Sequence, residues 1–283
     1  MKFKKAVGAE RYTIFATDRV KRPEQANISK SSGCPFCSNN IDKSQVVDYI
    51  GSSRYSWRVV SIKNKYPITD LAEVIVHSPD HSRSIELMSP GEMAEVYLMY
   101  QKRYVNLKDK GSVIIFCNYG KFAGASLEHP HSQIIVVDGS VKINQLPLQN
   151  FLPVVYTQGD FELVVPEYSE YPYEVWIVNK KKGLLNFERD DFLAAGTLTQ
   201  KIISILITHL AEISLSKEHA NKPHIHWKDY GVAYNYYLSI GDDFYVRIIP
   251  KLSIQAGFEL ATDINVNVVD PVEVVELLKQ HLQ

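Results

Sequence analysis

The chain has 283 residues, 45% of them hydrophobic and 22% charged, a composition typical of a globular protein and not of a disordered, collagen-like or membrane-embedded one. Its formal net charge of −1 excludes the global basic field expected of a protein that binds a nucleic acid polymer. Three cysteines are too few for a disulfide scaffold. No signal peptide is visible and no apolar run approaches the ~18–20 residues that span a bilayer, so we expect a soluble, cytoplasmic protein with no membrane partner.

The first half of the chain predicts four strands and one helix. After about 60 polar and irregular residues, the strands are predicted at residues 59–62, 73–77, 112–117 and 133–137. Ser89, Pro90 and Glu92 supply an N-cap, a proline in the first turn and a capping-box partner, so a helix is expected to begin there. Apolar residues at spacings of three and four extend this helix to about Leu107.

The second half repeats this order. It predicts a strand at residues 174–178, a helix from about 190 to 213, and strands near 233–238 and 245–249. Asp270, Pro271 and Glu273 then begin a short amphipathic helix that ends at Leu282. Because both halves read strand–helix–strand–strand, we predict the α+β class and two domains, 1–140 and 141–283, joined by a connector at residues 138–153.

Two cysteines form a metal-ligand pair. Cys34 and Cys37 have the C-x2-C spacing, at which two thiolates on one loop can bind a tetrahedral zinc. A thioredoxin-like redox pair would have a strand before it and a helix after it, whereas loop residues flank this pair on both sides. The pattern therefore favours zinc, for which two further ligands are needed.

Histidines gather in two segments that could supply those ligands. His81 lies between a predicted strand and the capped helix, and His129 and His131 flank Pro130 just before a predicted strand. In extended backbone, residues i and i+2 point to the same side, and proline keeps the residue before it extended. The two imidazoles of this His-Pro-His segment are therefore expected side by side.

The remaining cysteine and histidines carry weaker signals. Cys117 sits inside an apolar strand and is expected to be a buried core thiol. His77 ends a strand and fits no motif. His224 and His226 form a second pair, in a polar loop where the pattern favours a solvated pair over a metal site.

A turn rich in small residues precedes the His-Pro-His segment. Residues 118–126 contain Gly120, Gly124, Ala125 and Ser126, so backbone amides there could approach a phosphate closely. The turn has neither the P-loop pattern nor a dinucleotide-binding fingerprint. Taken alone, it indicates phosphate binding only weakly.

Together these motifs resemble the galactose-1-phosphate uridylyltransferases, a family of the histidine-triad (HIT) superfamily. The resemblance centres on Asn118-x-Gly120, Gly124-x-Ser126 and His129-Pro130-His131-x-Gln133-Ile134. Five further segments agree in order and approximate spacing, and they are Asp18-Arg19-Val20-Lys21-Arg22-Pro23, the pair Cys34 and Cys37, Asn64-Lys65-Tyr66-Pro67, Ser78-Pro79-Asp80-His81-Ser82, and Ala256-Gly257-Phe258-Glu259. The resemblance implies two tandem HIT-like halves, each an antiparallel sheet with a packed helix, of which the N-terminal half is zinc-bearing and catalytic.

The resemblance also implies a metal site and a reaction. One structural zinc would be held by Cys34, Cys37, His81 and His129. A neutral His131, its other ring nitrogen held by an acceptor such as a backbone carbonyl, would attack the α-phosphorus of a nucleotide, and Gln133 would donate to a phosphoryl oxygen. The implied substrate-binding residues are Arg19, Arg22, Asn64, Asn118, Ser126 and Glu259. In the family, the two arginines act across the interface of a homodimer.

The C-terminal half departs from the family pattern. Tyr245-Val246-Arg247-Ile248 stands where a duplication would place His131-Ser132-Gln133-Ile134, so no second nucleophile is expected. Asp243-Phe244-Tyr245 stands where many members have a second His-x-His, so no second metal is expected.

The function favoured by these residues is a nucleotidyltransferase that moves UMP or AMP between nucleoside diphosphate sugars and sugar 1-phosphates. One alternative is an ADP-sugar or dinucleoside polyphosphate phosphorylase or hydrolase of the same superfamily. Another is a non-enzymatic, zinc-stabilised nucleotide-binding protein. The small HIT hydrolases have a third histidine where this chain has Gln133, and a neutral amide cannot act as a general acid, which favours transfer over hydrolysis.

Overall fold

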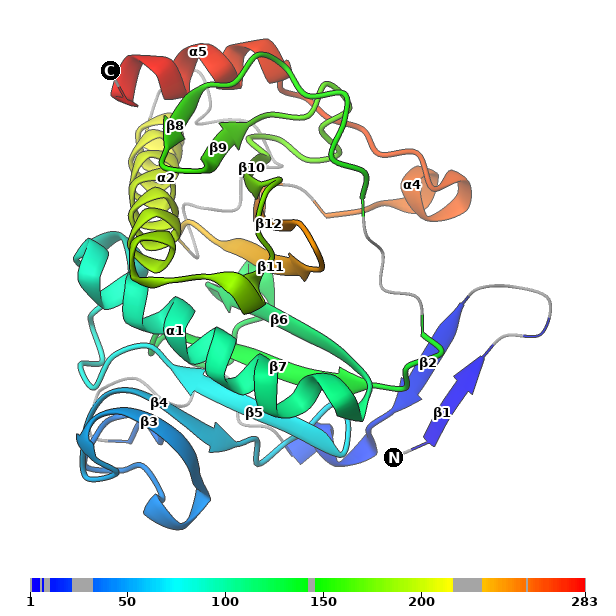
Figure 1. Ribbon diagram of the computed structural model, residues 1–283. Coiled ribbons are helices and arrows are strands. Elements are labelled where there is room, and N and C mark those ends of the chain that lie inside the picture. Colours follow the sequence, from blue (N-terminus) through cyan, green and yellow to red (C-terminus); the bar gives the residue numbers. More distant parts are fainter. Residues whose placement is uncertain are drawn as a thin grey trace.

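The computed structural model describes residues 2–5, 7, 11–21, 33–141, 146–215, 231–252 and 254–282. Three residues of interest from the sequence, Arg22, His224 and His226, lie outside these ranges. The class is α+β, as predicted, with a large antiparallel sheet and packed helices (Figure 1).

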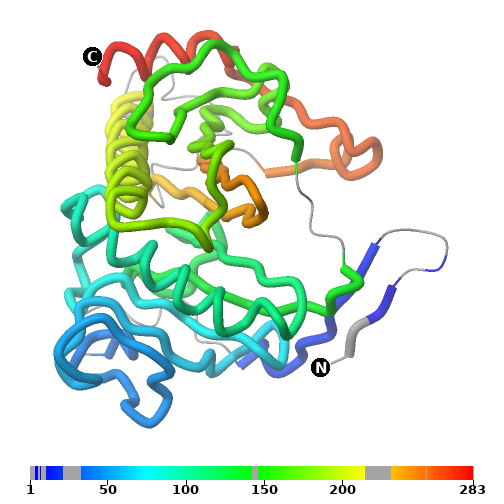
Figure 2. Tube along the Cα trace, in the orientation of Figure 1, coloured from blue at the N-terminus to red at the C-terminus, as the bar shows by residue number. Residues whose placement is uncertain are grey.

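Ten strands form one sheet in the order β3-β4-β5-β7-β6-β11-β12-β10-β9-β8, and every neighbouring pair is antiparallel. The strands are β3 (Val46–Ser53), β4 (Ser56–Lys63), β5 (Leu71–Val76), β6 (Ser112–Tyr119), β7 (His131–Val137), β8 (Tyr156–Gln158), β9 (Phe161–Val164), β10 (Val175–Asn179), β11 (Tyr234–Ile240) and β12 (Phe244–Pro250). A separate hairpin pairs β1 (Lys2–Lys5) with β2 (Tyr12–Phe15). Figure 2 shows this hairpin projecting from the body of the protein.

The middle of the sheet joins the two parts of the chain. β6 pairs with β11, with Asn118 opposite Asn235 and Cys117 opposite Tyr236. The sequence predicts one sheet in each half, whereas this pairing merges both sets of strands into a single sheet. Backbone hydrogen bonding explains the single sheet. As edge strands of two separate sheets, β6 and β11 would each leave a row of N–H and C=O groups unpaired, and by pairing with each other they satisfy these groups.

Two helices cover one face of the sheet. They are α1 (Pro90–Leu107) and α2 (Arg189–Leu215), and they pack against each other and against the strands (Figure 1). The predicted capping box is present in α1, since the Glu92 amide donates to Ser89 Oγ at 3.3 Å and the Ser89 amide to the Glu92 carboxylate at 2.7 Å. The C-terminal helix α5 (Pro271–Leu282) packs against α2, and the short α4 (Gly257–Thr262) lies apart from the sheet.

By length and composition alone, α2 could cross a membrane, over Arg189–Ile213. Its apolar residues belong to the protein core, because 56% of the apolar window is buried inside the protein. Ala195, Leu198 and Ile202 are fully buried in the main core. Core helices commonly have this composition.

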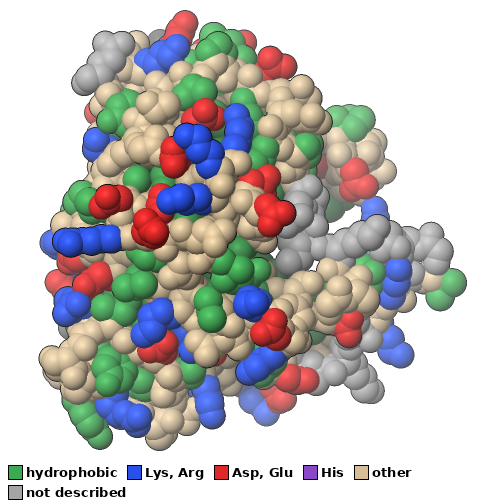
Figure 3. Space-filling model, viewed as in Figure 1, with side chains coloured by type: hydrophobic (Ala, Val, Ile, Leu, Met, Phe, Trp, Pro, Cys, Tyr) green, Lys and Arg blue, Asp and Glu red, His purple; other side chains and the backbone are tan. Residues whose placement is uncertain are grey.

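Side chains along β7 alternate between the hydrophobic core on one face of the sheet and the candidate site on the other. Ile134 and Val136 point to the helix side and join the main hydrophobic core. His131 and Gln133 point to the opposite side, because successive strand residues face opposite ways. The helix-covered face carries Lys and Arg side chains interspersed with Asp and Glu, without a patch of one sign (Figure 3).

Candidate functional site

Four side chains from three separate segments form a possible metal centre. The ligand atoms of Cys34, Cys37, His81 and His129 all lie within 4.8 Å of one another. Cys37 Sγ lies 3.6 Å from His81 Nδ1 and 3.7 Å from His129 Nδ1. In a tetrahedral zinc site with bonds of about 2.0–2.3 Å, two ligand atoms are roughly 3.3–3.8 Å apart. The two distances from Cys37 to the histidines fall in this range, and the predicted ligand set could hold a metal such as zinc.

The surroundings of this cluster favour ligation. His129 Nε2 donates to the Ser78 carbonyl at 2.8 Å, which orients Nδ1 towards the cysteines. Burial lowers the pKa of His129 to about 4, so its imidazole is neutral and can bind a metal. Burial and the neighbouring Cys34 raise the pKa of Cys37 to about 11, so its thiolate needs a nearby cation. These donors fit zinc, which would close all four positions with protein.

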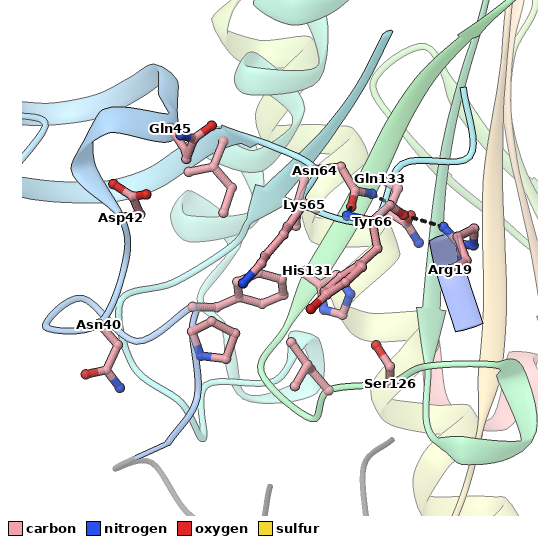
Figure 4. Close-up of a pocket in the computed structure, with 15 residues that line it drawn as sticks. Arg19, Asn40, Asp42, Gln45, Asn64, Lys65, Tyr66, Ser126, His131 and Gln133 are labelled. Atoms are coloured by element: carbon pink, nitrogen blue, oxygen red, sulfur yellow. Dashed lines mark hydrogen bonds between the residues drawn. The ribbon is translucent and has the colours of Figure 1, made fainter. Parts of the chain in front are cut away.

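His131, the first residue of β7 and two residues after His129, faces a pocket of about 520 Å³ (Figure 4). Gln133 lines the same pocket because it lies two residues further along β7. Arg19, Asn64 and Ser126 reach it from three other segments. The structure thus brings five residues of the predicted site into one cavity.

A hydrogen bond sets the tautomer of His131. Its Nδ1 lies 2.7 Å from the His129 carbonyl oxygen, and because a carbonyl can only accept, Nδ1 carries the proton. Nε2 of the neutral ring therefore carries the lone pair. This matches the expectation that a backbone carbonyl holds the other nitrogen. The Phe36 ring, between the two cysteines, lies 5.0 Å from the His131 ring.

A chain of contacts orients the polar side of the pocket. Asn64 Nδ2 donates to Gln133 Oε1 at 3.3 Å, and Asn64 Oδ1 accepts from the Tyr66 amide at 2.9 Å. Arg19 Nη1 donates to the Tyr66 carbonyl at 2.7 Å. With its oxygen engaged by Asn64, Gln133 has its amide nitrogen as the group that can donate to an anion.

Two predicted substrate-binding residues lie away from the pocket, and a third is not described. Asn118 accepts from Asn235 Nδ2 at 2.8 Å in the middle of the sheet and does not line the pocket. Glu259 caps α4, where its carboxylate accepts from the Ala256 amide at 3.0 Å, and it does not line the pocket either. Arg22 lies outside the described residues. Arg19 lines the pocket of its own chain, whereas the resemblance implies a contribution across a dimer interface.

Several pocket residues were not among the predicted site residues. They include Phe36, Asp42, Gln45, Lys65 and Tyr66. Phe36 lies inside the C-x2-C pair, and Lys65 and Tyr66 lie in the turn that resembles the family's nucleotide-contacting turn, so the sequence held a signal for these three. Asp42 caps a short 3-10 helix, Lys43–Gln45, that follows the cysteines, and no motif marked either Asp42 or Gln45.

The corresponding place in the second half is filled by side chains. Tyr245 of β12 lies opposite Val178 of β10, as His131 lies opposite Val76 of β5. Arg247, two residues on, is 4% exposed and donates to Glu174 at 2.7 and 3.0 Å. A buried ion pair therefore stands where the first half has Gln133.

Comparison with known proteins agrees with this geometry. Residues 15–139 match a domain family described as the N-terminal domain of DUF4931, a domain of unknown function. An ADP-glucose phosphorylase from Arabidopsis thaliana is 22% identical, over 95% of this chain and 90% of the relative. A galactose-1-phosphate uridylyltransferase from Thermotoga maritima is 26% identical, over 64% of this chain and 68% of the relative.

Solved structures share the fold. The crystal structure of an ADP-glucose phosphorylase from Arabidopsis thaliana with bound ADP-glucose has a TM-score of 0.68 at 20% identity, covering 99% of this chain and 98% of that one. A uridylyltransferase structure has a TM-score of 0.70 at 18% identity, covering 100% and 99%. A DUF4931 family protein from Bacillus cereus has a TM-score of 0.56 at 18% identity, covering 84% and 99%. The resemblance indicated by the sequence is thus confirmed: the chain is similar in sequence and in fold to ADP-glucose phosphorylase and to the galactose-1-phosphate uridylyltransferases.

Proposed function

We propose that the chain is a nucleotidyltransferase that acts on nucleoside diphosphate sugars through a covalent nucleotidyl-histidine. The observation that carries the proposal is the hydrogen bond from His131 Nδ1 to the His129 carbonyl, made beside a pocket that Arg19, Ser126 and Gln133 also line. It leaves the Nε2 lone pair as the nucleophilic group of a neutral imidazole.

The reaction takes place in two balanced steps. In the first, His131 Nε2 forms a bond to the α-phosphorus of the nucleoside diphosphate sugar, and the bond from that phosphorus to the bridging oxygen breaks, releasing a sugar 1-phosphate. In the second, a phosphate oxygen of the acceptor attacks the same phosphorus and the P–N bond breaks, which regenerates neutral His131. This order gives ping-pong kinetics.

Nearby donors stabilise the charge that develops on the phosphoryl oxygens. Gln133 donates through its amide nitrogen, because Asn64 occupies its oxygen. Arg19 supplies a positive charge and Ser126 a hydroxyl, both at the pocket wall. Asn118 and Glu259 receive no role at the phosphates of this chain's own pocket, since neither lines it.

A zinc ion held by Cys34, Cys37, His81 and His129 would have a structural role, since all four of its positions would be occupied by protein. These residues come from the loop after residue 33, the loop after β5 and the segment before β7. The four ligands therefore hold the backbone carbonyl of His129 in place, and that carbonyl sets the tautomer of His131.

Two tandem HIT-like halves, 1–140 and 141–283, are part of the same proposal. The sheet order supports it, because β3-β4-β5-β7-β6 and β8-β9-β10-β12-β11 are matching sequences of strands read from opposite edges. The first half is then the catalytic one. The second is degenerate, with Tyr245 and Arg247 buried at the positions of His131 and Gln133.

A phosphorylase is the second candidate, in which inorganic phosphate takes the place of the sugar phosphate as acceptor. The relative that covers 95% of this chain is named an ADP-glucose phosphorylase, which favours this acceptor. Both candidates share the first step and differ in the second. A non-enzymatic nucleotide-binding protein would perform neither.

The test is covalent labelling with UDP-glucose and ADP-glucose, each carrying 32P in the α-phosphate, followed by quenching in alkaline denaturant and peptide mapping at alkaline pH. We expect an alkali-stable, acid-labile label on His131 that chases into nucleotide on addition of glucose 1-phosphate or phosphate. His131→Asn should abolish the label, while His281→Asn, at an exposed histidine of α5, should retain it. Absence of label with both substrates would refute the proposal and leave the binding protein.

A further inference from the structure

The nucleotide pocket carries opposite charges at its two ends. Arg19 and Ser126 lie beside His131 and Gln133, whereas Asp42 lies at the far end with Asn40 and Gln45 (Figure 4). A carboxylate repels phosphate, so the phosphates of a nucleotide bind at the Arg19 end.

One apolar part of the pocket wall suits the base and ribose. Phe36, Ile62 and Val74 line it with apolar surface. A nucleotide whose α-phosphate lies at His131 therefore directs its base along this wall towards Asp42.

The local structure holds the Asp42 carboxylate in one place. Its Oδ1 accepts from the Ser44 amide at 2.9 Å and from Ser44 Oγ at 2.7 Å. These hydrogen bonds lower the pKa of Asp42, so the group is ionised at neutral pH. Asp42 forms no ion pair with any other described residue, and both of its hydrogen bonds with Ser44 end on Oδ1 rather than Oδ2.

A carboxylate oxygen discriminates between bases because it accepts and never donates. Adenine presents an exocyclic amino group, a donor that Oδ2 can receive. The corresponding edge of uracil presents carbonyl oxygens on both sides of a single N–H, and these repel a carboxylate. Guanine presents two adjacent donors that would need both carboxylate oxygens as acceptors. Because Oδ1 already accepts two hydrogen bonds from Ser44, guanine fits this carboxylate less well than adenine does. Asn40 and Gln45 can donate or accept and do not discriminate.

We propose that Asp42 makes this pocket selective for adenine nucleotides over uridine nucleotides. The inference rests on the proposed function, because it takes the phosphate position from His131. It assigns to this site an adenosine diphosphate sugar as the class of donor substrate.

The test measures the dissociation constants of AMP and UMP by calorimetry on the whole chain. We expect wild-type protein to bind AMP at least tenfold more tightly than UMP. Asp42→Asn should reduce this preference to threefold or less, because an amide can donate to a uracil carbonyl. Asn is as good an N-cap as Asp, so the short helix at Lys43–Gln45 keeps its cap. Asp42→Ser, which also preserves the cap, should reduce the preference equally.

Asp138→Asn is the matched control. Asp138 makes the same pair of contacts with Ser140, at 2.8 Å to the amide and 2.6 Å to the hydroxyl, but lies outside the nucleotide pocket. Its variant should keep the wild-type preference. Equal binding of AMP and UMP by the wild type, or an unchanged preference in Asp42→Asn, would overturn the inference.

The labelling of His131 separates this outcome from a failure of the proposed function. If the label forms equally fast from UDP-glucose and ADP-glucose, the transfer chemistry stands and base selection by Asp42 is wrong. If no label forms while AMP still binds tenfold more tightly than UMP, base selection stands and the chemistry is wrong. If neither nucleotide binds at millimolar concentration, both are wrong.

Discussion

Arg247→Met tests whether the buried ion pair of Arg247 and Glu174 stabilises the fold without taking part in the chemistry at His131. The Arg247 side chain is 5% exposed and that of Glu174 is completely buried. Arg247 donates to Glu174 at 2.7 and 3.0 Å and to Glu170 at 2.6 Å, and it stacks 5.6 Å from the Trp176 ring. Burial alone would lower the pKa of Arg247, but the hydrogen bonds and charge of Glu174 more than offset this and raise it. The guanidinium is therefore charged at every working pH.

Methionine fills most of the same volume but leaves the Glu174 carboxylate buried without its cation. Removing one partner of a buried ion pair costs about 3–5 kcal/mol of unfolding free energy. For a chain of this size, about 1 kcal/mol corresponds to roughly 2–4 °C, so the melting temperature should fall by roughly 6–20 °C. In the variant, three groups still donate hydrogen bonds to the Glu174 carboxylate: the Trp176 indole and the amides of Glu170 and Tyr171. Because they stabilise the charge in part, we expect a fall in melting temperature near the lower end of this range.

The assay is thermal unfolding followed by circular dichroism, beside the labelling of His131 at 20 °C. The double variant Arg247→Met with Glu174→Gln should recover part of the loss, because no unpaired charge is then buried. Labelling per folded molecule should equal that of wild type in both variants. A melting temperature within 2 °C of wild type would refute the argument from buried charge, and loss of labelling in a stable Arg247→Met protein would refute the structural role.

Four other outcomes are expected. Metal analysis should give about one zinc per chain, and chelation or His81→Ala should remove it and lower the melting temperature by about 10 °C. Phe36→Leu should retain zinc but lower kcat about tenfold, since the ring no longer packs 5.0 Å from His131, and Phe36→Tyr should restore it. Hydrogen bonds from Arg83, the largest cause, and from Ser89 lower the pKa of Glu92 to about 2, so Glu92→Gln should cost about 1 kcal/mol above pH 5, and the difference should vanish as pH falls through 2. Light scattering should give twice the mass of one chain, as expected of a homodimer.

Local signals in the sequence predicted much of the fold. Ser89, Pro90 and Glu92 fixed the start of α1 because a capping box needs only four consecutive residues. The strands around His131 and the helix that ends at Leu282 were predicted for the same reason, from short apolar patterns. The His-Pro-His segment placed two imidazoles on one strand entry, and the structure does bring His129 to the cysteines and His131 to the pocket.

Features that depend on distant segments were missed. Strand β3 lies within residues that the sequence describes as irregular, because it is an edge strand with register shifts around Gly51 and a half-exposed pattern. The short strands β8 and β9 have too few residues to show a period. No local sequence pattern encodes long-range contacts. The pairing of β6 with β11 is one such contact, and the position of Asp42 in a pocket formed with residues about 90 positions away is another.

The β6–β11 pairing also bears on where the chain can be divided. The matched domain family ends at residue 139, two residues after β7 ends, so a fragment with those bounds would contain β6 without its neighbour. Five residues of β6, from Ile115 to Tyr119, are paired with β11 in the intact chain and would form an open edge. Two such fragments could satisfy each other by placing β6 against β6 in antiparallel register. In the intact chain, β11 therefore does for β6 what a second copy of the fragment would have to do, and it does so without a change in oligomeric state.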